Sequence, residues 1–398
     1  MKNTHPTLYV EINEFNFIFF VIEYDEQKNF KISYKSTIPL KGISNNSITD
    51  FEEVFNLIKE NIYLIEKKIN YTFREIILIT ENFNPTFINI TGFKKLNGSQ
   101  ILRENITYIL NTLKSYVDKI ETKKNVIHIF NSKFNLDNKK IENLPIGLFG
   151  DFYSHELSFV LINSNDYQNL KNIFSKCNLK IKKILNKNFI KGAVVNNKNK
   201  GCDTFFYIKI ENNNSKIFYF ENNSLKFEQN FKFGSDIILK DISKITSLKT
   251  NNVKMILENT LLKRELAEDE LVEKELFKDT DYIKIKKKLI YQIAFARIQE
   301  IFEIILYKNV NFKHYKKNSK VIFLEIDQNL QFKGLEEVYK TVFSMNSSLA
   351  LNILENLPSE SLLEMANELV HFGWKKEAIP IAQSKKTIIA RFFDALFG

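Results

Sequence analysis

Cysteine, glycine and proline are all scarce in this chain. Its 398 residues include 2 cysteines, 11 glycines and 6 prolines. Neither Cys177 nor Cys202 belongs to a CxxC pair or has a histidine nearby, so the sequence argues against a zinc site. Because no secretion signal precedes them, we expect both thiols to be free in a reducing cytosol.

A long hydrophobic run is also missing. A membrane-spanning helix needs about 20 apolar residues, and the longest apolar run, "FNFIFFVIEY" at residues 15–24, is much shorter. We expect this run to be a buried strand. The N-terminus, "MKNTHPTLYVEIN", lacks the pattern of a cleavable signal, because its apolar stretch begins late and continues into acidic residues.

The formal net charge of +10 at pH 7 favours an anionic partner. The lysines are scattered and no module of interleaved aromatic and basic residues is present, so we expect acidic lipid or acidic protein rather than nucleic acid. The histidines are dispersed and form neither a Ser-His-Asp arrangement nor a metal-ligand cluster. We expect each of them to be structural or exposed: His5, His128, His155, His314 and His371.

What is present is a regular pattern of strands and helices. Residues 7–36 predict consecutive strands, and residues 74–80 predict a buried strand. Between them, residues 49–69 predict an amphipathic helix that Thr49 or Asp50 can cap. Its apolar residues are spaced for one helical face: Phe51, Val54, Phe55, Ile58, Ile62 and Ile65. The chain therefore opens with the order β-β-β-α-β.

Residues 84–163 predict a separate unit with a helix at 98–120 and two strands after it. The loop between these strands, "LDNKKIENLPIGLFGD", concentrates a proline and two glycines, which indicates a specific turn. A helix, "DYQNLKNIFSKCNL", and a strand, "IKKIL", follow.

From residue 203 the opening arrangement recurs, with three strands and a helix, "GSDIILKDISKI", which indicates a weak internal duplication. Farther along, residues 262–275 and 286–307 predict helices, residues 319–326 predict a buried strand, and "GLEEVYKTVF" predicts a helix after it. Residues 375–386 are typical of a linker.

The chain ends in "KKTIIARFFDALFG", which predicts a short amphipathic helix. Its apolar face consists of Ile388, Ile389, Phe392, Phe393, Leu396 and Phe397. The basic residues Lys385, Lys386 and Arg391 lie elsewhere on the helix and favour anionic lipid. We expect reversible binding to a membrane surface, strengthened when several copies bind together. The alternative is a helix docked on the protein itself or on a partner.

Two β-β-β-α-β halves, an extra unit after the first half and a helical insertion in the second describe the actin superfamily. Several stretches, in order and in register, resemble one of its families, the FtsA family of bacterial cell-division proteins: "INITGFKKLNGSQIL", "FNLDNKKIENLPIGLFGDFYSHELSFVLIN", "LKNIFSKCNLKIKKIL", "FGSDIILKDIS" and "IYQIAFARIQEIFEIIL". "NLPIGLFG" approximates the family's N-P-x-G-x-x-G turn, and "KCNL" resembles its C-G-L before a strand. The resemblance covers most of the chain.

The resemblance implies an α/β, actin-like fold (a duplicated, ribonuclease H-like β-β-β-α-β-α arrangement) with two lobes, an FtsA-type extra subdomain and a C-terminal amphipathic helix. The implied division is 1–83 with 164–202 as subdomain 1A, 84–163 as subdomain 1C, 203–240 with 308–372 as subdomain 2A, 241–307 as subdomain 2B, 373–386 as a linker and 387–398 as the membrane-targeting helix.

The resemblance also implies partners and a location. Proteins of this family tether FtsZ, a polymerising tubulin-like protein, to the inner face of the membrane, and their extra subdomain serves self-association. The expected partners are the C-terminal peptide of FtsZ, further copies of this chain, anionic lipid and other division proteins, at the cytoplasmic face of the membrane and the division septum. The residues expected at the FtsZ peptide are Arg297, Lys284, Lys286 and Lys287. The alternative for each of them is a solvated basic face.

The superfamily holds ATP between two phosphate loops, and both loops depart from the family pattern here. The first, D-I-G-S in FtsA, aligns with Glu11, Ile12, Asn13 and Glu14. The second, D-I-G-G-G-T-T-D, aligns with Lys209, Ile210, Glu211, Asn212, Asn213, Asn214, Ser215 and Lys216, before Gly234. The glycine-rich adenosine loop becomes Asp327, Gln328 and Asn329, and it ends at Gly334.

A side chain in place of glycine blocks the approach of backbone N–H groups to phosphate. Asparagine tolerates positive φ, so we expect the turns themselves to survive. We expect no catalysis and no metal site; ATP binding is left open, and a lysine at 209 offers an alternative contact for phosphate. Two other functions remain open: a working ATPase or sugar kinase of the same superfamily, and a scaffold of a pilus or secretion apparatus resembling PilM.

Overall fold

In the computed structural model, residues 5–24, 30–261, 263–277, 281–326, 332–345, 349–355, 357–374 and 376–378 are described. The chain forms two compact units. The first comprises residues 1–200, 222–226 and 358–398, and the second comprises residues 201–221 and 227–357. Across the described ranges, no helix is both long and apolar enough to cross a bilayer.

The first unit contains a five-stranded sheet with the order β11-β6-β1-β2-β3. Its strands are β1 (Thr7–Ile12), β2 (Asn16–Tyr24), β3 (Phe30–Pro39), β6 (Glu75–Thr80) and β11 (Lys180–Asn186). β1 pairs antiparallel with β2 and parallel with β6, which is parallel to β11. The central strands β1, β2 and β6 are mostly buried, as expected of strands covered on both faces. The predicted β-β-β-α-β opening is confirmed.

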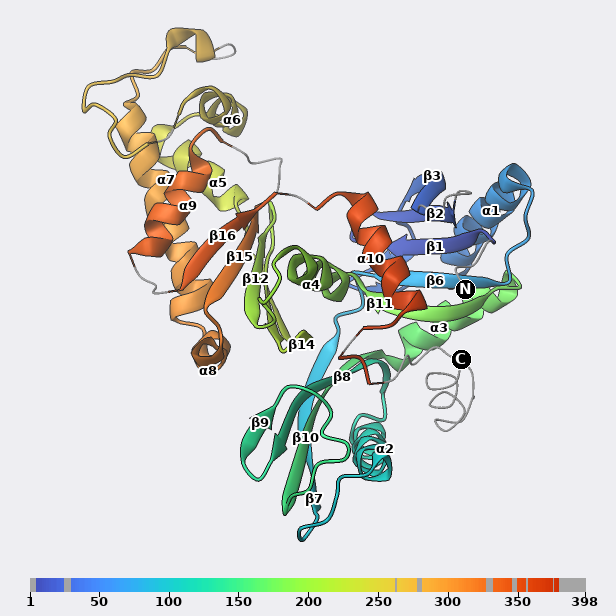
Figure 1. The fold of residues 1–398 in the computed structure, drawn as a ribbon. Coiled ribbons are helices and arrows are strands. Elements are labelled where there is room, and N and C mark those ends of the chain that lie inside the picture. Colours follow the sequence, from blue (N-terminus) through green and yellow to red (C-terminus); the bar gives the residue numbers. More distant parts are fainter. Residues whose placement is uncertain are drawn as a thin grey trace. The chain divides into compact units, whose positions relative to one another are not determined.

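Four helices belong to the same unit as this sheet: α1 contacts α3, and α4 contacts α10 (Figure 1). They are α1 (Phe51–Ile69), α3 (Ser164–Lys176), α4 (Lys187–Lys198) and α10 (Ser359–His371), and a small hairpin of β4 (Ile43–Ser44) and β5 (Ser47–Ile48) precedes α1. Asp50 caps α1, because its carboxylate accepts the Glu53 N–H at 2.9 Å. Asn70 ends it with a left-handed φ of 54°.

The segment inserted between β6 and α3 forms a sheet of its own, with the order β7-β10-β8-β9. Its elements are β7 (Thr86–Lys95), α2 (Arg103–Ile120), β8 (Lys124–Leu136), β9 (Lys139–Ile141) and β10 (Phe152–Asn163). We call this segment, residues 84–163, the extra module. α2 packs on the sheet over a core that includes Ile109, Leu113, Phe134 and Leu157. In the predicted turn, Gly147 has a φ of +89°, a conformation that favours glycine.

Residues 376–378 lie against β8, so the linker expected at 373–386 does not begin at 373. Backbone hydrogen bonds of 2.6 and 2.7 Å join the segment to the strand, and Glu377 forms an antiparallel bridge with Phe130. The indole N–H of Trp374 donates to the carbonyl of Asn223 at 2.7 Å. The polar sequence suggested a solvated linker, but the segment supplies a strand partner and a buried carboxylate.

That carboxylate completes a buried cluster of three ionisable groups. The backbone N–H of Asn186 donates to Nε2 of His128 at 3.1 Å, so the neutral ring carries its proton on Nδ1 and donates it to Glu377 at 3.1 Å. Lys183 donates to the other Glu377 oxygen at 2.7 Å and to the Leu369 carbonyl at 3.2 Å. Burial lowers the pKa of His128, although Glu377 opposes this. Burial also disfavours the Glu377 carboxylate, but His128 and Lys183 lower its pKa overall.

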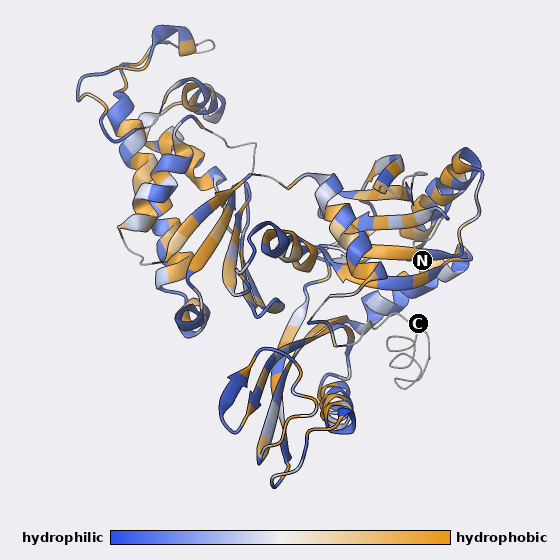
Figure 2. Ribbon diagram, in the orientation of Figure 1, coloured by the Kyte–Doolittle hydropathy of each residue, from blue (hydrophilic) through white to orange (hydrophobic). Residues whose placement is uncertain are grey.

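The second unit repeats the sheet of the first, with the order β14-β13-β12-β15-β16. The strands are β12 (Phe205–Ile210), β13 (Ser215–Glu221), β14 (Ser224–Phe231, whose first residues belong to the first unit), β15 (Val321–Ile326) and β16 (Ala350–Leu354). β12 is antiparallel to β13 and parallel to β15, which is parallel to β16. These are the directions found in the first unit, so the predicted duplication is confirmed. Hydrophobic residues concentrate in the central strands of each sheet (Figure 2).

The helices of the second unit share one apolar core with its sheet. They are α5 (Asp236–Thr246), α6 (Thr250–Asn259), α7 (Lys287–Phe302), α8 (Val310–Tyr315) and α9 (Leu335–Ser344), with short 3₁₀ turns at Lys274–Leu276 and Lys316–Asn318. α7 continues into a π-helical turn at Glu303–Tyr307, so the predicted helix at 286–307 is irregular at its end.

The helix predicted at 262–275 is wrong. Residues 263–273 contain no helix in the described part of the segment. Val272 donates its N–H to the Ile285 carbonyl at 2.9 Å, and Leu271 bridges Lys286, so residues 270–272 lie beside residues 285–287. Its charged composition favours a helix, but tertiary contacts outweigh that propensity.

Candidate functional site

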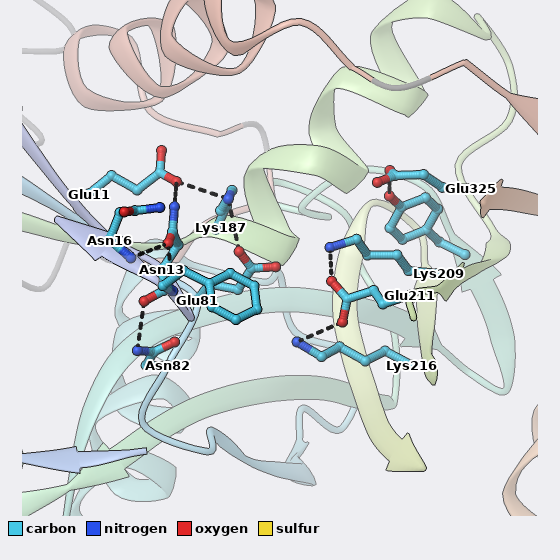
Figure 3. Close-up of polar contacts among 12 residues, drawn as sticks. Glu11, Asn13, Asn16, Glu81, Asn82, Lys187, Lys209, Glu211, Lys216 and Glu325 are labelled. Carbon is cyan, nitrogen blue, oxygen red and sulfur yellow. Dashed lines mark hydrogen bonds and ion pairs between the residues drawn. The ribbon is translucent and has the colours of Figure 1, made fainter. Parts of the chain in front are cut away.

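The first candidate loop lies between β1 and β2 and bonds its own backbone N–H groups. The Asn13 side-chain oxygen accepts the N–H of Phe15 at 3.0 Å and of Asn16 at 2.8 Å (Figure 3). The Asn13 N–H in turn donates to the Asn16 carbonyl at 3.1 Å. An asparagine therefore closes the turn from within, and these N–H groups do not point to an outside acceptor.

An ammonium group lies between two carboxylates beside this loop. Lys187 Nζ is 2.9 Å from Glu11 and 2.8 Å from Glu81 (Figure 3). Glu11 lies on β1, Glu81 directly follows β6, and Lys187 is the first residue of α4; each side chain is less than 15% exposed. Burial would lower the pKa of Lys187, but Glu81 and Glu11 raise it well above its ordinary value. The lysine is therefore a permanent cation at this position.

The second candidate loop, after β12, packs against the start of α5. Ser235 and Asp236 donate their backbone N–H groups to the carbonyls of Glu211 and Asn212, both at 2.9 Å. The N-terminus of a helix is an anion site because such N–H groups are otherwise unsatisfied. At the start of α5, carbonyls of the same chain use two of them. Gly234 is needed for this packing, since a Cβ there would lie 2.0 Å from the Glu211 carbonyl oxygen.

Two lysines flank the carboxylate of this loop. Lys209 forms an ion pair with Glu211, and Lys216 lies 3.9 Å from the other Glu211 oxygen (Figure 3). In the same sheet, the buried Tyr207 hydroxyl donates to Glu325. Lys209, the alternative phosphate contact predicted from the sequence, therefore has a carboxylate of its own loop as a partner.

Only part of the adenosine loop can be placed. Asp327, Gln328 and Asn329 lie outside the described residues. Gly334 begins α9 with a φ of +89°. Beside it, at the ends of β15 and β16, is a cavity of about 300 Å³, the size of a small ligand site. Its lining includes Ile326, Phe332, Glu336, Glu337, Lys340 and Ile353.

These contacts test whether the residues present fit magnesium and the phosphates of ATP, and they do not. The N–H groups of Phe15 and Asn16 and those at the start of α5 have internal acceptors, and a lysine already lies between the two carboxylates of the first unit. The expectation that asparagine preserves left-handed turns in these loops is wrong, because Asn13 and Asn212–Asn214 do not have positive φ. Asparagine has that role elsewhere: nine of the twelve described non-glycine residues with positive φ are asparagines.

The residues predicted at the FtsZ peptide do not form one cluster. Arg297 pairs with Asp241 on α5 and with Glu300. Lys287, about 15 Å away along α7, contacts Glu270 at 2.9 Å and Glu273 at 2.5 Å. The hydrogen bond from Lys287 lowers the pKa of Glu273, and the same bond raises the pKa of Lys287.

Lys284 and Lys286 are exposed just before α7. The predicted membrane residues, Lys385 to Phe397, lie outside the described residues. Within the described ranges, no group of three or more histidine, cysteine, aspartate or glutamate side chains could hold a metal ion.

The sequence singled out Glu11, Asn13, Lys209 and Glu211, and the structure places each of them in the loops. It did not point to Lys187 or Glu81. The sequence feature that could have indicated Lys187 is its position directly after the buried strand "IKKILN", where strand ends and helix starts converge.

No known protein-family profile matches the chain. The cell division protein FtsA of Buchnera aphidicola subsp. Acyrthosiphon pisum (strain APS) is 20% identical over 228 residues, 57% of this chain and 54% of that protein. The chain thus matches about half the length of this curated relative.

Solved structures with a similar fold include a PilM-PilN type IV pilus biogenesis complex (TM-score 0.49, 10% identity, 94% of this chain and 98% of that chain). Another is MreB5 of Spiroplasma citri bound to AMPPNP (TM-score 0.43, 10% identity, 92% and 96%). A third is the ethanolamine utilization protein EutJ from Carboxydothermus hydrogenoformans (TM-score 0.42, 8% identity, 93% and 91%). Two sheets of the same order and the same strand directions are the core of the actin-like fold. The chain therefore has an actin-like fold, and over about half its length it is similar to a cell-division FtsA protein.

Proposed function

We propose that this protein is a cell-division scaffold that connects FtsZ to the cytoplasmic face of the membrane at the septum. The observation that carries the proposal is the similarity to FtsA over 228 residues. The position of the extra module, inserted between β6 and α3, supports it. In this role the protein bridges its partners and needs no turnover chemistry.

Membrane attachment is assigned to residues 387–398. As a helix, this segment would present six large apolar side chains on one face. Fully burying one of them is worth roughly 1.5–3 kcal/mol, and each basic residue near anionic lipid adds up to about 1 kcal/mol. Partial burial and the cost of ordering a short helix reduce this gain. A single copy would bind reversibly, and an assembly of several copies would bind firmly.

Self-association is assigned to the extra module. One end of its sheet carries exposed apolar side chains on neighbouring segments: Phe93, Leu102, Leu148, Phe149 and Phe152. Phe93 and Phe152 stack with ring centroids 5.5 Å apart, although they are 61% and 41% exposed. Exposed apolar patches of this kind are typical of interaction sites, and the FtsA resemblance makes a second copy the expected occupant.

Capture of the FtsZ peptide is assigned to the start of α7. Since Arg297 and Lys287 already have carboxylate partners, the exposed Lys284 and Lys286 are the better candidates for an acidic peptide. Changing both to glutamine should weaken binding of the FtsZ peptide, measured by fluorescence anisotropy. Unchanged affinity would remove this surface from the proposal.

The experiment that tests the whole proposal is flotation with vesicles containing anionic lipid, with and without FtsZ. Full-length protein should float and bring FtsZ with it, and protein lacking residues 385–398 should bring neither. The doubly substituted Phe392→Ser, Phe393→Ser protein should behave like the truncation. A matched control, Phe372→Ser, changes a phenylalanine that is 73% exposed but lies outside the segment. Flotation of the truncated protein would overturn the mechanism.

A further inference from the structure

We infer that Lys187 is a resident cation of the first unit, which occupies the place of a divalent metal ion between Glu11 and Glu81 and makes this half of the fold independent of magnesium and nucleotide. The inference concerns the chemistry of the loop and does not depend on the proposed role in cell division.

The geometry leaves no room for a metal ion beside the lysine. Its Nζ is 2.9 Å from one carboxylate and 2.8 Å from the other. Mg²⁺ needs near-octahedral oxygen ligands at about 2.0–2.1 Å. An ion between Glu11 and Glu81 would thus coincide with the ammonium group. Asn13 also donates its side-chain amide to Glu11 at 3.3 Å, which uses the same carboxylate oxygen.

The position of Lys187 in its helix supports the same conclusion. It is the first residue of α4, where the helix dipole disfavours positive charge. The side chain is 14% exposed, so the ammonium group has also lost most of its water. A buried cation at a helix N-terminus is stable only because two carboxylates surround it, and these carboxylates would repel each other without it. The lysine and the two glutamates therefore depend on one another.

The charge of the cluster also resists pH. The pKa of Lys187 lies well above its ordinary value because Glu81 and Glu11 outweigh the effect of burial. A raised lysine pKa contributes stability that is complete below the ordinary value and is lost only as the pH rises through the folded value. At neutral pH the ammonium group is fully present.

The loop of the second unit has two ammonium groups around one carboxylate, whereas the loop of the first unit has one ammonium group between two carboxylates. There Lys209 and Lys216 flank the single carboxylate of Glu211. The first N–H groups of α5 are bonded to the same loop. Each unit thus closes its own loop with side chains and carbonyls of the chain.

The test is the response of thermal unfolding to Mg²⁺ and to Mg–ATP in full-length protein. Wild-type protein should show no change in Tm with either, and no heat in titration calorimetry with Mg–ATP. Lys187→Gln should lower Tm by roughly 6–20 °C, because it removes the cation that compensates two buried carboxylates. Millimolar Mg²⁺ should restore part of this loss, since the freed carboxylates can now bind it. The control Lys240→Gln removes an exposed partner of Asp236 and should give no response to Mg²⁺.

If Lys187→Gln does not fold, the variant Glu81→Gln, Lys187→Gln replaces it, because it removes one charge of each sign. Its Tm should not respond to Mg²⁺, since a single carboxylate remains. A gain of several degrees in wild-type Tm with Mg–ATP would overturn the inference. So would a folded Lys187→Gln protein that Mg²⁺ does not stabilise, or a response to Mg²⁺ in the double variant.

Discussion

Replacing Glu377 by glutamine should destabilise the first unit more than any surface substitution. The Glu377 side chain is 2% exposed, and its two oxygens accept from His128 and Lys183. Glutamine has nearly the same shape but no charge, and its one side-chain oxygen can accept from His128 or from Lys183 but not from both. Lys183, itself 6% exposed, would keep its bond to the Leu369 carbonyl but lose the carboxylate that compensates its charge.

Breaking a buried ion pair by removing one partner costs about 3–5 kcal/mol, because a buried charge remains uncompensated. For a unit of this size, 1 kcal/mol shifts Tm by about 2–4 °C. The expected fall in Tm is therefore roughly 6–20 °C. The matched control is Glu75→Gln, which breaks a 3.7 Å contact with Lys182 between two partly exposed side chains. Its expected effect is below about 1 kcal/mol.

The assay can use the only tryptophan of the chain. Trp374 lies three residues before Glu377 and packs edge-on against Phe189, with ring centroids 5.9 Å apart. Its fluorescence during urea unfolding thus reports release of this segment as well as unfolding of the first unit. In Glu377→Gln, the midpoint should move to lower urea concentration.

A second substitution distinguishes lost charge balance from lost shape. Adding Lys183→Met to Glu377→Gln removes the uncompensated ammonium group, so the double variant should recover much of the loss. A Glu377→Gln protein whose Tm lies within 2 °C of the wild-type value would contradict the reasoning. So would a double variant whose loss of stability exceeds the sum of the losses in the two single variants.

Three further outcomes are expected. Burial lowers the pKa of His155 from 6.5 to about 4, so the ring is neutral when folded. The unfolding free energy should then fall by up to about 3 kcal/mol from pH 6.5 to 4, and in His155→Gln this part of the pH dependence, measured by urea denaturation, should disappear. Gly234→Ala should cost at least about 1–3 kcal/mol, since its Cβ would meet the Glu211 carbonyl; Gly373→Ala, with no atom within 4 Å, should lose only about 1 kcal/mol from its positive φ. The free energy of unfolding of Asn70→Gly should exceed that of Asn70→Ala by at least about 1 kcal/mol, because only glycine adopts the left-handed cap freely.

Two kinds of element were predicted from the sequence: helices that bury one face, and short strands that are buried along their whole length. α1 buries Val54, Ile58, Ile62 and Ile65 and exposes the opposite face, so its period is visible in the residue order. α4 was not predicted because nearly all of its residues are buried, including polar ones, and no helical period remains. The helix expected at 262–275 failed for the converse reason: its composition favours a helix, but residues 270–272 bond to residues 285–287 instead of forming helical turns.

The candidate loops were found from the sequence because the family pattern fixes where they occur. Their chemistry was not, because it depends on a side chain from another element. Lys187 reaches Glu11 across 176 positions of chain, and nothing in the local sequence of either residue indicates the other. The docking of residues 376–378 was missed for the same reason, since the partner of Glu377 is His128 on β8.

The attachment of residues 376–378 to β8 has a mechanical consequence. Any tension on the end of the chain enters the body through Glu377 and its neighbours, where an antiparallel bridge, an ion pair with Lys183 and a hydrogen bond from His128 resist it. Lys183 and His128 pass that load to β11 and β8, so both the five-stranded sheet and the extra module bear it. A pull along the strand would have to shear several bonds at once rather than open them one by one.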